Sequence, residues 1–105
     1  MPRTAILYAR SHRRDNLARQ VRELEDWCDR AGVVPLETVA EVALGIRASK
    51  RCRQLLADVA AGRADLLLIR DVARLSHDPR QLQQIINQYR HQIAISWDDR
   101  DPSRW

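Results

Sequence analysis

The fold is decided by Asp65-Leu66-Leu67-Leu68-Ile69, a continuous apolar run of strand length. A run of this kind is typical of a parallel strand covered on both faces, because neither side of it presents polar groups to water. A second strand is predicted from Thr4 to Arg10, and it is expected to be a central strand buried for most of its length. Polar residues follow both strands, at residues 11–16 and at residues 70–77.

Three segments with apolar residues at helical spacing separate the predicted strands. Gly32 is expected to end the first helix, and Gly62 the second. The residues expected to cap the helix starts are Asp15 or Asn16, then Ser49, then Asp78 followed by Pro79. The apolar stripes are Leu17, Val21, Leu24, Cys28 and Ala31, then Cys52, Leu55, Leu56 and Val59, then Leu82, Ile85, Ile86 and Tyr89.

Two further strands complete the pattern. The first covers 33–42 and contains Pro35, which favours an outer strand, and the second covers 93–97. Alternating strands and helices predict a three-layer α/β fold with a mainly parallel four-stranded sheet of order 2-1-3-4 and helices on both faces. In this order strands one and three are neighbours, so the turns that follow them converge. We expect one domain over residues 1–98, a polar tail over 99–105 and no separate DNA-binding domain.

The net charge and the arginine content of the chain give an indication of the kind of partner it binds. The chain has 105 residues, a net charge of +4, and Lys50 as its only lysine, so nearly all cations are arginines. The guanidinium group grips phosphate through a planar fork, which points weakly to an acidic partner. Cys28 and Cys52 lie at apolar helical positions and are expected to be reduced core residues of a cytoplasmic protein. No membrane span, signal peptide, cofactor or metal is predicted.

Several motifs occur in a specific order and spacing. They are Tyr8-Ala9-Arg10, Gln20, Leu24, Gly45, Arg51, Gln54-Leu55-Leu56, Gly62, Asp65 and Arg74-Leu75-Ser76. Together they resemble the N-terminal catalytic domain of the serine recombinases, the resolvases and DNA invertases, over about residues 3–98. The resemblance implies a serine, two residues after the first-strand arginine, that attacks a DNA phosphodiester. It also implies arginines that offset the developing charge, and Arg10, Arg51 and Arg74 match three of them.

The chain departs from the pattern of that family at several positions. His12 occupies the nucleophile position, and Ala73 replaces the acidic residue usually found just before Arg74. His77 replaces an arginine, and Leu44-Gly45 replaces the Ser-Gly pair of a flexible loop. The arginine cage is therefore partly kept, whereas the attacking group and an acidic partner are replaced.

Three interpretations of this site compete. In one, Ser11 is a displaced nucleophile, which a strand's pleat would turn away from Arg10 unless the backbone bulges. In another, His12 attacks phosphorus with His77 as acid or base. The third, which we prefer, is a domain that has lost strand cleavage and keeps a phosphate pocket. That pocket would use Arg10, Arg51, Arg74 and His77.

We therefore predict a resolvase-like domain associated with site-specific DNA recombination, from a mobile element, a phage or a remnant of either. It would bind DNA phosphate or a related recombinase subunit, or form a homodimer, and lack strand cleavage. DNA binding by the isolated domain should be weak, salt-sensitive and non-specific. The alternatives are an active domain that forms a phosphoserine–DNA link through Ser11, and a small phosphate- or nucleotide-binding domain unrelated to DNA.

Overall fold

A four-stranded parallel sheet forms the centre of the molecule in the computed structural model, which describes residues 2–97. The strand order is β2-β1-β3-β4, as the sequence predicts. The strands are β1 (Thr4–Ser11), β2 (Val34–Val42), β3 (Leu66–Ile69) and β4 (Ile93–Ile95).

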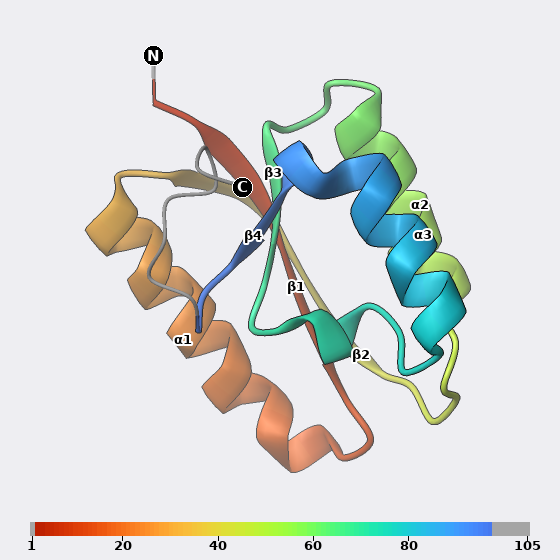
Figure 1. Ribbon diagram of the computed structural model, residues 1–105. Helices are drawn as coiled ribbons and strands as arrows, with labels where there is room; N and C mark the ends of the chain where they lie inside the picture. The colour runs from red at the N-terminus through yellow and green to blue at the C-terminus, as the bar shows by residue number, and fades with distance from the viewer. Residues whose placement is uncertain (1, 98–105) are drawn as a thin grey trace.

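Helices cover both faces of this sheet (Figure 1). One face carries α1 (Leu17–Ala31), and the other carries α2 (Lys50–Ala60) and α3 (Pro79–Tyr89). Three short 3-10 turns, η1 (Arg14–Asn16), η2 (Val72–Arg74) and η3 (Arg90–Gln92), adjoin the strands and helices. The predicted three-layer α/β architecture is confirmed.

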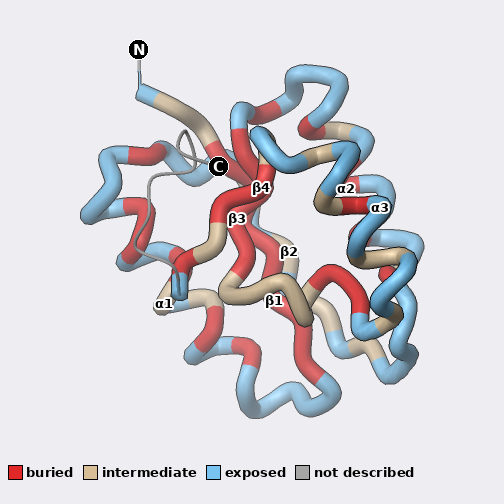
Figure 2. The backbone as a smooth tube through the Cα atoms, viewed as in Figure 1, coloured by how far each residue is buried: buried red, intermediate tan, exposed pale blue. Residues whose placement is uncertain are grey.

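Strand β3 shows why the apolar run decides the fold. Its side chains alternate between the two faces, because Leu66 and Leu68 join the cluster under α1 whereas Leu67 and Ile69 join the cluster under α2. All four residues are buried, and Figure 2 shows the two central strands as the buried middle of the molecule. Each such side chain contributes about 1.5–3 kcal/mol through burial.

Strand β2 is the outer strand that Pro35 predicted. Its exposed residues alternate with half-buried ones between Leu36 and Val42. Its pairing with β1 shifts by one residue between Ala5 and Ile6, which is the mark of a β-bulge. A proline and a bulge on an outer strand both oppose pairing with another chain.

Two of the predicted N-terminal helix caps form hydrogen bonds, whereas Asn16 occupies the N-cap position of α1 without one. Ser49 accepts the Cys52 N–H at 3.0 Å, and Asp78 accepts the Arg80 N–H at 3.0 Å. Asn16 makes no capping hydrogen bond, because it already has helical backbone angles at the end of η1. The last strand is also shorter than predicted, because Ser96 and Trp97 form a turn after Ile95.

The predicted polar tail at 99–105 lies outside the described residues. Within residues 2–97, the helices are too short or too polar to cross a bilayer.

Candidate functional site

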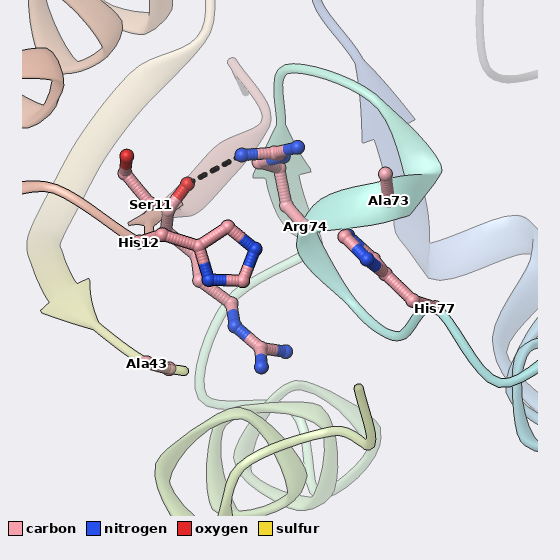
Figure 3. Close-up of a pocket in the computed structure, with 7 residues that line it drawn as sticks. Ser11, His12, Ala43, Ala73, Arg74 and His77 are labelled. Atoms are coloured by element: carbon pink, nitrogen blue, oxygen red, sulfur yellow. Dashed lines mark hydrogen bonds between the residues drawn. The ribbon is translucent and has the colours of Figure 1, made fainter. Parts of the chain in front are cut away.

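The turns after β1 and β3 meet at the carboxyl edge of the sheet, which confirms their predicted convergence (Figure 3). Parallel strands end on the same side, so neighbouring strands bring their following turns together. The turns enclose a cavity of about 10 Å³, which is roughly the space of one water molecule. The residues around it are Arg10, Ser11, His12, Ala43, Ala73, Arg74 and His77.

Arg10 lies at this cavity with a buried positive charge, since the residue is only 5% exposed. Its guanidinium donates from Nη2 to the Gly45 carbonyl at 2.7 Å and from Nη1 to the Leu75 carbonyl at 3.4 Å. No carboxylate among residues 2–97 forms an ion pair with it. Carbonyl dipoles offset only part of the cost of burying a full charge, so this group favours an anion nearby.

Gln20 fixes the backbone of Arg10 from helix α1. Its side-chain oxygen accepts the Arg10 N–H at 3.0 Å, and its amide nitrogen donates to the Arg10 carbonyl at 3.1 Å. Gln20 is 1% exposed and occupies the apolar stripe of α1 between Leu17 and Leu24. A polar side chain inside such a stripe is the signal that could have marked Gln20 as a positioning residue from the sequence.

Arg74 approaches the cavity from the turn after β3. Its Nη1 donates to the Arg10 carbonyl at 2.7 Å, and its Nε donates to Asp71 Oδ1 at 3.3 Å. Asp71 also accepts the Arg70 Nε–H at 3.0 Å and caps the η2 turn through the Ala73 N–H. Asp71 therefore orients the Arg74 side chain. Among the described residues, no three His, Cys, Asp or Glu side chains gather closely enough to hold a metal ion.

His12 and His77 lie against each other at the cavity. Their ring centroids are 5.9 Å apart and the rings meet edge to face at 83°. Both residues are exposed, and Figure 3 shows the two rings near the Arg74 side chain. Two imidazoles beside a guanidinium place several N–H groups around one small cavity.

Ser11 is the last residue of β1, and its hydroxyl accepts the Arg13 N–H at 3.1 Å. Figure 3 shows this hydroxyl directed away from the two imidazoles, as the pleat of a strand requires of a residue between Arg10 and His12. Ser11 therefore lines the wall of the cavity without presenting its oxygen to it.

The other groups with nucleophilic potential near the site are buried. The Tyr8 hydroxyl donates to Glu41 Oε1 at 2.8 Å, and burial raises the pKa of Tyr8 well above its usual range. Burial likewise raises the pKa of the Cys52 thiol to about 12. Neither group is an anion near neutral pH, so neither offers an activated nucleophile.

Arg51 is the one predicted site residue that the structure does not bring to this cavity. It stands in the first turn of α2, where its Nη2 donates to Glu37 Oε1 at 3.3 Å. Its side chain is half exposed, and it lines a different hollow together with Glu41 and Ser49. The cavity thus gathers Arg10, Ser11, His12, Arg74 and His77.

Comparisons with known proteins agree with this fold. The family described as "Resolvase, N terminal domain" matches residues 5–96. The C-terminal catalytic domain of ISC1926 TnpA, an IS607-like serine recombinase, is 23% identical, with 90% of this chain and 70% of that chain covered and a TM-score of 0.71. The N-terminal catalytic domain of TP901-1 integrase is 16% identical, with 81% and 67% covered and a TM-score of 0.69. No curated protein sequence matches the chain.

Proposed function

We propose that this chain, which belongs to the resolvase N-terminal domain family, binds DNA phosphate in a site-specific recombination system and does not cleave DNA strands. The observation that carries the proposal is the buried guanidinium of Arg10, which has no carboxylate partner among residues 2–97. A phosphodiester at the cavity would supply the missing negative charge.

The size of the cavity suggests how a phosphate would sit. A space of about 10 Å³ admits one phosphate oxygen toward Arg10 but not the whole group. The remaining oxygens would lie at the mouth, where Arg74 and the exposed rings of His12 and His77 provide donors. Such contacts go to the backbone of DNA, so they position the domain without reading sequence.

Loss of cleavage follows from the missing nucleophile. The Ser11 hydroxyl is held by the Arg13 N–H and points away from the imidazoles, and Tyr8 is buried. A misplacement of even about 1 Å is costly for a displacement at phosphorus. His12, at the nucleophile position implied by the family pattern, then serves as a hydrogen-bond donor to phosphate rather than as the attacking group.

DNA binding tests the pocket directly. We expect the wild-type domain to bind a short fluorescent duplex with an affinity that falls as salt is raised. Replacing both Arg10→Gln and Arg74→Gln should abolish this binding, because both guanidinium groups at the cavity are lost. The control is Arg51→Gln with Arg63→Gln, which removes the same charge outside the cavity and should retain most of the affinity. If the two double variants lost DNA affinity equally, the cavity would not be the site of phosphate binding.

A covalent-adduct assay tests the loss of cleavage. Denaturing gels of the domain incubated with nicked and intact duplexes should show no protein–DNA adduct. A Ser11-dependent adduct, absent from Ser11→Ala and present in His12→Ala, would establish an active recombinase domain instead. Tight binding of a free nucleotide with no DNA binding would favour the function unrelated to DNA.

A further inference from the structure

Exposed large apolar side chains are concentrated in one stretch of the chain, β2 and the loop that follows it. Six large hydrophobic residues are exposed in the described part of the chain, and five of them fall between positions 34 and 46. The two most exposed of these five are Leu44 at 77% and Ile46 at 63%. Both belong to the segment 43–47, the first part of the connection from β2 to α2, which borders the cavity through Ala43.

This loop is held in place by its backbone rather than by its apolar side chains. The Gly45 carbonyl accepts Arg10 Nη2 at 2.7 Å, and the Ile46 carbonyl accepts the His77 N–H at 2.6 Å and the Ser76 hydroxyl at 3.2 Å. The Ala43 N–H donates to the Ser11 carbonyl at 3.1 Å. The loop therefore presents Leu44 and Ile46 to water in a fixed position, which is unfavourable unless something covers them.

The surroundings of the loop indicate what covers it. Arg10 and Arg74 line the adjacent cavity, and the exposed Arg13 and Arg14 follow Ser11 at the same edge of the sheet. The aliphatic side chains of Leu44 and Ile46 thus lie beside several arginines. A polyanion that also exposes apolar surface between its charges would complement this arrangement. The minor groove of duplex DNA has that character, since proteins insert Leu and Ile side chains between its base steps.

We infer that Leu44 and Ile46 form an apolar wedge that enters the minor groove of DNA while the cavity holds a neighbouring phosphate. This inference rests on the proposed DNA-phosphate function and adds a contact to the bases. Inserting the wedge partly unstacks a base step, so a duplex that is already unstacked should bind more tightly. The Arg10–Gly45 hydrogen bond links the two contacts, because the same guanidinium that faces the phosphate fixes the wedge.

Fluorescence anisotropy with an intact duplex and a duplex carrying one mismatch tests the wedge. The wild-type domain should prefer the mismatched duplex by about tenfold, because the mismatch removes most of the unstacking cost. Leu44→Ala with Ile46→Ala should lose this preference and leave the salt dependence of binding unchanged, since no charge is removed. The control, Val34→Ala with Leu36→Ala, removes similar apolar surface at the opposite end of β2 and should keep the preference.

The outcomes separate the wedge from the phosphate pocket. Binding that needs Arg10 and Arg74 but shows no mismatch preference, or a preference untouched by the Leu44 and Ile46 changes, overturns the wedge alone. A change in sedimentation of the Leu44 and Ile46 variant without a change in DNA affinity would assign the loop to a contact between protein chains and also overturn it. Absence of any DNA binding by the wild type would remove the proposed function first.

Discussion

Two arginine-rich regions of the molecule differ in whether carboxylates neutralise their positive charges. On the outer surface of β2 and α2, Arg51 and Arg63 share the carboxylate of Glu37, and Arg63 also contacts Asp58 at 2.9 Å. At the carboxyl edge of β1 and β3, the guanidinium of Arg10 donates only to the Gly45 and Leu75 carbonyl oxygens among the described residues. The first region is balanced by its own acids, whereas the second keeps a positive charge.

The difference indicates that arginines matching the same family pattern can lie in very different electrostatic surroundings. Arg10 and Arg51 both match that pattern, yet only Arg10 is buried and without an acidic partner among residues 2–97. Charge balance around the side chain, rather than residue type, separates an anion site from a surface ion pair. Three experiments can break or sharpen this comparison.

The largest effect is expected from Gln20→Ala. This change leaves both the N–H and the carbonyl of Arg10 without their buried side-chain partner. We expect the free energy of unfolding to fall by about 2–3 kcal/mol, together with weaker DNA binding. Urea denaturation measures the first effect, and Gln83→Ala, which removes an exposed glutamine bonded to Asn87, is the control. A loss no greater than that of the control would show that the support under Arg10 is dispensable.

An intermediate effect is expected from inorganic phosphate. An anion that binds the folded cavity should raise the free energy of unfolding by about 1.4 kcal/mol at a tenfold excess over its dissociation constant. Sodium chloride at matched ionic strength serves as the control for screening. The stabilisation should disappear in Arg10→Gln with Arg74→Gln and persist in Arg51→Gln with Arg63→Gln. If it persisted in both variants, the cavity would not be the phosphate site.

The two regions also show which features of the fold and the site can be predicted from the sequence. The layers can be predicted from the sequence. Burial on both faces leaves a continuous apolar run, as at 65–69, and burial on one face of a helix leaves an apolar stripe at helical spacing. Strand order then brings Arg10 and Arg74 together. The partners of Arg10 depend on the irregular loop 43–47, and the direction of Arg51 depends on Glu37 across the surface. Neither contact produces a repeating pattern in the sequence, so the sequence could not predict that Arg10 and Arg51 have different partners.

The smallest effect is expected from Glu37→Gln, which removes the shared acid of the outer region. Arg51 and Arg63 are each about half exposed, with side-chain exposures of 50% and 54%, so water replaces the lost partner. The free energy of unfolding should change by about 1 kcal/mol or less, and less still at high salt. Urea denaturation at low and high salt measures this, with Arg19→Gln, which breaks another exposed ion pair, as the control. A loss comparable to that of Gln20→Ala would contradict the comparison, because the outer arginines would then depend on their acid as strongly as the site depends on its buried support.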